Sequence, residues 1–300
     1  MAPEEDPMTE DQSTPPPADG TDFPLIDGSR STTRMGREVF ACAADPVDPD
    51  LAARTRAVRN WRKGYLEPGR DLVGAAAVSA SNATAIAAAG LSELHTRFVF
   101  GRFGEERPLQ EAVSDFSPQG FADVAVRSST PPAHRPELSL PYRGTQLTGH
   151  GILAQAHSWA DSGIAEPSLA GALAAAVDHP EWFDLSDLHV VLFGAGAELG
   201  PLRHLLSWGA HVWAIDLPRP AVWLRILRAV EGTPGTLHVP IPTSVPPPQA
   251  HDITGLTELA GANIITETPE IRGWLERVPG DFVIGNYGYA DGGLHVRLSM

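Results

Sequence analysis

Residues 189–216 constrain this chain more than any other stretch, because they combine a strand, a glycine turn, a helix and a second strand that ends in an acid. The first strand candidate, His189–Phe193, is apolar after its histidine and runs directly into Gly-Ala-Gly-Ala-Glu-Leu-Gly. The second apolar run ends at Asp216, 22 residues after Gly194. This spacing predicts a βαβ unit with parallel strands, which binds nucleotides beyond the carboxyl ends of its strands.

The three glycines of this turn have different expected tasks. Gly194 permits the sharp exit from the first strand, Gly196 lets a pyrophosphate approach the backbone, and Gly200 lets the helix pack on the sheet. The amides that open the helix would face the phosphates. Asp216 would accept hydrogen bonds from an adenosine ribose. The expected cofactor contacts of this unit are Gly194, Ala195, Gly196, Ala197, Gly200, Asp216 and Leu217.

This pattern resembles the Rossmann-fold NAD(P)-binding superfamily over residues 187–300, loosely in its short-chain dehydrogenase form. The glycine spacing differs from both G-x-G-x-x-G and G-x-x-x-G-x-G. Two looser similarities place Asn286 in a turn after a late strand and Asp252 beside the adenine ring. The resemblance implies an oxidoreductase that uses NAD(H) or NADP(H) on a small molecule. Because the carboxylate of Asp216 repels a 2′-phosphate, NAD(H) is the expected preference, although Arg219 nearby softens it.

The catalytic Tyr-x-x-x-Lys pair of short-chain dehydrogenases is absent, because the single lysine, Lys63, has no tyrosine four residues before it. Proton transfer would then fall to other groups. The expected catalytic residues are Tyr287, beside Asn286, and two members of an upstream Tyr-Arg-His segment, Tyr142 and His150.

That upstream segment, residues 142–157, is expected to face the turn at Gly285–Tyr287. His150 and His157 share one helix face but lie about 10 Å apart, so this pair cannot chelate one ion. No metal site is expected. The same residues are also expected if this helix packs on the nucleotide-binding domain with half-buried histidines and has no catalytic role.

Two other functions remain open at this stage. S-adenosylmethionine-dependent methyltransferases also place a Gly-x-Gly turn after the first strand and an acid after the second, but their first strand usually ends in an acid where this chain has Leu192 and Phe193. Glu198, in the expected first turn of the helix, would repel a pyrophosphate if it pointed inward. The missing Tyr-Lys pair also fits a non-catalytic cofactor-binding or sensor protein.

The chain as a whole is expected to be α/β, with a Rossmann-like parallel-sheet domain over residues 187–300 preceded by a mainly helical domain over 23–183. Residues 1–22 hold five prolines and seven acids with no basic residue, which predicts a disordered tail. Helices are expected at 51–65, 72–94, 146–161, 168–178, 198–208, 221–230, 255–260 and 269–278. Strands are expected at 189–193, 211–215, 236–241, 263–266 and 282–285, with a final edge strand at 294–298.

Charge and cysteine content exclude several function classes. The chain carries 22 basic and 37 acidic residues, a net charge of −15, so nucleic acid and anionic membranes are not expected partners. A single cysteine, Cys42, rules out an internal disulfide and a CxxC site. The acidic N-terminus does not resemble a signal peptide, and no apolar run is long enough to span a membrane. A cytoplasmic protein with a small-molecule substrate, and with scope for homo-oligomers, is expected; the sequence leaves open whether the natural chain continues beyond Met300.

Overall fold

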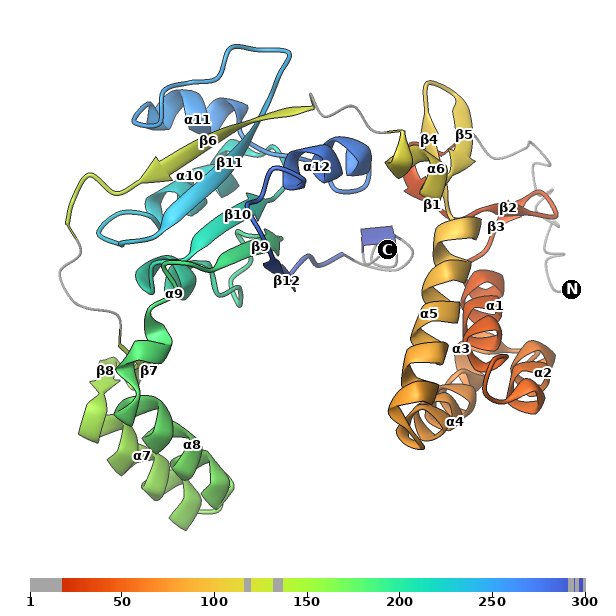
Figure 1. Ribbon diagram of the computed structural model, residues 1–300, viewed down its shortest axis with the longest axis horizontal. Helices are drawn as coiled ribbons and strands as arrows, with labels where there is room; N and C mark the ends of the chain where they lie inside the picture. The colour runs from red at the N-terminus through yellow and green to blue at the C-terminus, as the bar shows by residue number, and fades with distance from the viewer. Residues whose placement is uncertain (1–17, 116–119, 132–136, 291–293, 295–296, 299–300) are drawn as a thin grey trace, which may run out of the picture. The chain divides into compact units, whose positions relative to one another are not determined.

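The computed structural model describes residues 18–115, 120–131, 137–290, 294, 297 and 298. It forms two compact units (Figure 1). Unit 1 comprises residues 18–115 with Leu294, Arg297 and Leu298, and unit 2 comprises 120–131 and 137–290. The division falls after residue 115, whereas the sequence predicted a domain boundary near residue 183. The physical reason is that residues 121–127 pair with a strand more than a hundred positions later.

Helices make up most of unit 1, as the sequence predicted, but two of the expected helices are interrupted. The expected helix over 51–65 breaks at Val58, where the backbone is extended. The expected helix over 72–94 is divided by Ser79, whose side chain accepts a hydrogen bond from the amide of Asn82 at 3.1 Å and so caps a new helix. The helices of unit 1 are α1 (Thr32–Ala44), α2 (Pro49–Ala57), α3 (Trp61–Gly64), α4 (Leu66–Ala77), α5 (Ala80–Arg97) and α6 (Leu109–Ser114).

Unit 1 also contains short strands that the sequence did not predict. A three-stranded antiparallel sheet has the order β1-β4-β5, and a small hairpin joins β2 to β3. Phe23, Phe98 and Phe100 pack with Met35 of α1 to form the core beside this sheet. The strands are β1 (Gly20–Asp22), β2 (Leu25–Ile26), β3 (Ser29–Arg30), β4 (Val99–Arg102) and β5 (Glu105–Pro108).

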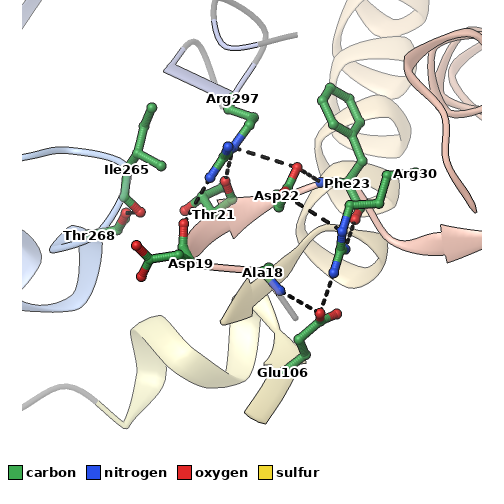
Figure 2. A network of polar contacts seen from close by, with 10 residues as sticks. All are labelled: Ala18, Asp19, Thr21, Asp22, Phe23, Arg30, Glu106, Ile265, Thr268 and Arg297. Carbon is green, nitrogen blue, oxygen red and sulfur yellow. Dashed lines mark hydrogen bonds and ion pairs between the residues drawn. The ribbon is translucent and has the colours of Figure 1, made fainter. Parts of the chain in front are cut away.

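Two expectations about the chain ends are wrong where the structure describes them. Residues 20–22 were expected in a disordered tail but form β1, because they pair with β4; residues 1–17 lie outside the described residues. The expected edge strand at 294–298 is also absent, since Leu294, Arg297 and Leu298 are helical. Figure 2 shows Arg297 at β1, where its guanidinium donates to the carbonyl oxygens of Thr21 and Asp19 at 2.5 and 2.9 Å.

Unit 2 is built on a five-stranded sheet with the order β12-β9-β10-β11-β6. Four strands are parallel, and β6 is antiparallel to β11, so the sheet is mixed and mostly parallel. Four of the strands, β9 to β12, fall where the sequence predicted them, within one residue at either end. The strands are β6 (Phe121–Arg127), β9 (His189–Phe193), β10 (His211–Ile215), β11 (Thr236–Pro242) and β12 (Phe282–Asn286).

The expected strand at 263–266 is wrong, because this segment is a turn. The side chain of Asn263 accepts a hydrogen bond from the amide of Ile265 at 3.0 Å, and the carboxylate of Glu267 accepts one from the amide of Asn263 at 2.7 Å. Local side-chain bonds of this kind compete with strand pairing. The fourth parallel strand is therefore β12, which lies beside β9.

Helices cover both faces of this sheet. Val212 and Ala214 of β10 belong to a core with α10, α11 and the α9 region, whereas Trp213 and Ile215 belong to a second core with α12. This alternation is that of a strand buried on both faces.

A separate hairpin and two packed helices, β7 to α8, lie between β6 and β9 in the chain. The remaining elements of unit 2 are β7 (Ser139–Tyr142), β8 (Thr145–Thr148), α7 (Gly149–Asp161), α8 (Pro167–Asp178), the 3-10 helix η1 (Pro180–Phe183), α9 (Leu202–Ser207), α10 (Pro220–Arg228), α11 (Ile253–Leu259) and α12 (Thr268–Leu275).

Candidate functional site

The candidate site lies at the carboxyl edge of the parallel strands of unit 2. In the sheet register, Ile215 at the end of β10 is opposite Phe193 of β9, and Phe193 is opposite Asn286 of β12. The turns that follow these three strands therefore meet at one edge. In open parallel sheets this edge is where ligands bind.

Gly194 lies at the centre of this edge and requires a glycine for two reasons. Its φ is 72°, in the left-handed region. A Cβ at this position would also lie 2.7 Å from the amide nitrogen of Gly288 and 2.8 Å from the carbonyl carbon of Tyr287. The turn after β12 is held close by the amide of Tyr287, which donates to the carbonyl oxygen of Phe193 at 2.8 Å.

Asp216 is bonded directly to the glycine turn. Its Oδ2 accepts a hydrogen bond from the amide of Gly196 at 2.8 Å, and its Oδ1 accepts one from the amide of Leu217 at 2.8 Å. Arg225 of α10 donates to the carbonyl oxygen of Gly196 at 3.0 Å. The carboxylate predicted to meet a ribose is thus fixed against the turn, and each of its oxygens keeps a further lone pair for a hydroxyl group.

Most amides of the turn already donate within the protein. The amides of Gly194 and Ala195 bond the carbonyl oxygen of Ile215 at 2.9 and 3.2 Å. Those of Ala197 and Gly200 bond the carbonyl oxygens of Gly194 and Ala197, each at 3.0 Å. The expected start of the following helix at residue 198 is wrong, because residues 198–201 form turns and α9 begins only at Leu202. A pyrophosphate would therefore find few free amides here.

Three further residues expected at the site, two for the cofactor and one for catalysis, make contacts within the protein. Asn286, at the end of β12, accepts a hydrogen bond from the amide of Gly288 at 3.0 Å through its side chain. Asp252 is the N-cap of α11, and its Oδ1 accepts a hydrogen bond from the amide of Gly255 at 2.9 Å. Tyr287 is 39% exposed, and its ring approaches Gly285, where a Cβ would lie 2.9 Å from Cε2 of the tyrosine. Of the three, Asn286 and Tyr287 lie at the candidate site.

Tyr142 and His150 belong to the separate hairpin and helix of unit 2. Tyr142 ends β7 and packs edge-to-face on Trp159 of α7, with ring centroids 5.3 Å apart. His150, near the start of α7, and His157 further along are both exposed. Within the described residues, no hydrogen bond, ion pair or ring contact joins Tyr142 or His150 to the Gly194 turn or to Asp216. Their catalytic roles stay predictions.

A histidine cluster on the α12 face of the sheet was missed by the sequence analysis. His211 and His238 approach at 3.3 Å between Nδ1 and Nε2, and Asp123 bonds Nδ1 of His238 at 2.8 Å. Trp213 stacks on His238 and donates to Nδ1 of His189 at 3.2 Å. The available signal was that β9 and β10 both begin with histidine, but only the register with β6 and β11 brings Asp123 and His238 alongside.

Burial and neighbouring charges lower the pKa values of two members of this cluster. Desolvation is the largest cause for both His189 and His211, followed by the charge of nearby groups: His238 for His189, and His189, His238 and Arg127 for His211. The distances fit a hydrogen-bond chain in which Nδ1 of His211 donates to Nε2 of His238 and Nδ1 of His238 donates to Asp123.

Among the described residues, no group of three or more His, Cys, Asp and Glu side chains is arranged to hold a metal ion. No helix among them combines the length and apolar character needed to cross a bilayer.

Comparison with known proteins found no matching family model, no matching curated protein and no matching solved structure.

Proposed function

We propose that unit 2 binds an adenosine-containing cofactor at the edge formed by the Gly194 turn, Asp216 and Asn286. The observation that carries this proposal is the 2.8 Å hydrogen bond from the amide of Gly196 to the carboxylate of Asp216. It holds an acid at the end of one strand against the glycine turn of its neighbour. A ribose bound over this turn would meet the carboxylate, which accepts hydrogen bonds from the ribose hydroxyls.

The sheet order supports the same proposal. Counted along the chain, the parallel strands β11, β10, β9 and β12 run 3-2-1-4, which is the order of the corresponding strands in a Rossmann sheet. The chain leaves β9 for β10 on one side, whereas β12 lies on the other. The order reverses between β9 and β12, and such a switch point is where cofactors bind in open α/β sheets.

The first candidate cofactor is NAD(H), with NADP(H) disfavoured because Asp216 repels a 2′-phosphate. Arg225, which already contacts the turn, is a cation close enough to offset the charge of a pyrophosphate. Unit 2 would then belong to an oxidoreductase that acts on a small molecule, with Tyr287 as the candidate acid or base nearest the turn. Tyr142 and His150 are the remaining candidates.

The second candidate cofactor is S-adenosylmethionine, and the bonded amides of the turn favour it. Gly194, Ala195, Gly196, Ala197 and Gly200 all donate within the protein, and α9 starts only at Leu202. A dinucleotide needs free amides to bind its phosphates. S-adenosylmethionine has no phosphate groups, so it needs only the contact between its ribose and Asp216. The enzyme would then be a methyltransferase.

Calorimetric titration of the full chain with NADH, NADPH and S-adenosylmethionine tests this proposal. Gly196→Val should abolish binding of whichever ligand binds, since even the first side-chain atom would lie 2.7 Å from Cγ1 of Val222 and 3.2 Å from Oδ2 of Asp216. Gly171→Val is the matched control, because its Cβ would meet nothing within 4 Å. Near-ultraviolet circular dichroism reports whether each variant keeps its tertiary structure.

Each outcome of the titration has a distinct meaning. Binding of NADH supports the oxidoreductase, binding of S-adenosylmethionine alone supports the methyltransferase, and binding of neither overturns the cofactor site. Asp216→Asn should weaken binding by about tenfold, the typical effect of losing a charged hydrogen-bond acceptor. Asp252→Asn keeps the cap of α11, since Asn caps as well as Asp, and weakens binding only if Asp252 meets the adenine.

A further inference from the structure

Unit 1 contains a cavity of about 470 Å³ that the proposed cofactor site does not use. Its size is within the range of small-molecule pockets, roughly 300–1,000 Å³. Most of its wall is apolar, and five of the lining side chains are aromatic. These rings are Phe23, Phe40, Trp61, Tyr65 and Phe98.

The aromatic wall is held in place by packing. Trp61 is only 8% exposed and packs edge-to-face on Phe40, with ring centroids 5.3 Å apart. Gly36 of α1 makes room for the indole, because a Cβ there would lie 2.9 Å from Nε1 of Trp61. Phe23 and Phe98 form a second ring pair at 5.1 Å. A wall of such fixed rings favours a flat or extended apolar group over bulk water.

The polar part of the wall is positive. Arg62, next to Trp61 on α3, is the charged residue among those that line the cavity. Thr32 and Thr33, the first two residues of α1, also line it and add two hydroxyl groups.

The start of α1 adds to this positive character. The side chain of Ser31 accepts a hydrogen bond from the amide of Arg34 at 3.2 Å, and its carbonyl oxygen accepts one from the amide of Met35 at 3.0 Å. The amides of Thr32 and Thr33 precede the first hydrogen bond of the helix ladder. The first turn of α1 itself carries no acid, and the neighbouring Asp27 is paired with Arg34, so the end of the helix dipole still favours an anion. This concentration of positive character is notable in a chain with a net charge of −15.

We propose that this cavity binds an apolar monocarboxylate, with its ring or chain among the aromatic side chains and its carboxylate toward Arg62 and the start of α1. The aromatic rings could also attract a cation, but the charged lining residue is an arginine, which repels cations and attracts anions. A wholly apolar ligand would make no use of the positive charge of Arg62 at the rim of the cavity. The proposal is independent of the cofactor site, which lies in the other unit.

Titration calorimetry of the full chain with 6-phenylhexanoate, 6-phenylhexanol and 6-phenylhexylamine tests this assignment. We expect the carboxylate to bind most tightly, the alcohol more weakly and the amine not measurably. Arg62→Gln should weaken binding of the carboxylate by about tenfold and leave that of the alcohol unchanged. Lys63→Gln is the matched control, because Lys63 is the adjacent exposed cation and does not line the cavity.

A second variant locates the bound molecule. Val39 lines the cavity, so Val39→Trp should fill it and abolish binding of both the carboxylate and the alcohol, with thermal unfolding showing that the variant is folded. The proposal is overturned if the wild type binds neither compound, if the amine binds as well as the carboxylate, or if Lys63→Gln weakens binding as much as Arg62→Gln. Binding that survives in a folded Val39→Trp variant lies elsewhere and overturns it as well.

Discussion

At the scale of single residues, the candidate site depends on backbone geometry more than on side-chain chemistry. Gly194 has no room for a Cβ beside Gly288, and Gly196 offers its amide to Asp216. The carboxylate of Asp216 therefore has a fixed position and spare lone pairs. The glycine pattern was a sufficient sequence signal for the turn between β9 and α9.

The requirement for glycine at position 194 leads to a stability prediction. Gly194 and Gly232 have nearly the same φ, 72° and 73°, but a Cβ on Gly232 would meet nothing within 4 Å. Gly232→Ala should lower the free energy of unfolding by about 1 kcal/mol, the cost of the left-handed conformation. Gly194→Ala should cost about 1–3 kcal/mol more, because its Cβ also collides with the turn after β12.

Urea unfolding followed by tryptophan fluorescence measures both losses, and six of the seven tryptophans lie in unit 2 with these glycines. Equal losses in the two alanine variants would show that the turn after β12 yields to the added methyl group.

At the scale of elements, strand register creates features that no single segment contains. The histidine cluster joins side chains of β9, β10, β11 and β6 on one face of the sheet, with Trp213 stacked on His238 at 4.1 Å. Competition between local hydrogen bonds and strand pairing accounts for the turn at residues 263–266. Its apolar residues matched a strand, but the side chain of Asn263 bonds the backbone within the turn.

The histidine cluster predicts that unit 2 loses stability in acid. Burial and neighbouring charges hold the pKa values of His189 and His211 below 6.5 in the folded protein, so the unfolded chain binds more protons as the pH falls through 6.5. Stability from this source is present above pH 6.5 and is lost as the pH falls toward the folded-state pKa values. Asp123 and Arg127 are the other charged groups facing the cluster from β6.

Urea unfolding at about pH 7.5 and about pH 5.5 measures this dependence. The double variant His189→Gln, His211→Gln should lose less stability between the two pH values than the wild type. The control is His157→Gln, which changes an exposed histidine of α7 and should keep the wild-type difference. An unchanged pH dependence in the double variant would contradict the prediction.

At the scale of the whole molecule, unit 2 recruits a strand from an early part of the chain. All seven residues of β6 pair with β11, and Val124 and Val126 enter the same core as Leu237 and Val239. Phe121 enters the core on the other face. A domain that began near residue 187 would lack this strand and would expose the edge of β11.

This topology predicts which fragments fold. A fragment of residues 116–290 should be monomeric and melt cooperatively, whereas one of residues 187–290 should aggregate or lack cooperative melting, because it exposes an apolar strand edge. Size-exclusion chromatography and thermal unfolding by circular dichroism compare the two. A monomeric 187–290 fragment with the same melting temperature as the longer one would show that β6 is dispensable.

The parts of this protein that depend on local patterns could be predicted from the sequence. These are the strands β9, β10, β11 and β12, the glycine turn between β9 and α9, and the position of Asp216 at the end of β10. Apolar runs, glycines and a terminal acid at fixed spacing are enough to identify them, because a strand and its turn are defined by neighbours in the chain.

The parts that depend on contacts distant in sequence became evident only from the three-dimensional fold. The pairing of β6 with β11, the histidine cluster and the aromatic cavity of unit 1 each join residues from segments that carry no mutual signal. The bonded amides of Gly194 and Ala195 are a further case, since their acceptor, the carbonyl oxygen of Ile215, lies on the next strand. Hydrogen bonds and packing between strands depend on register and burial, and these are set by the fold as a whole.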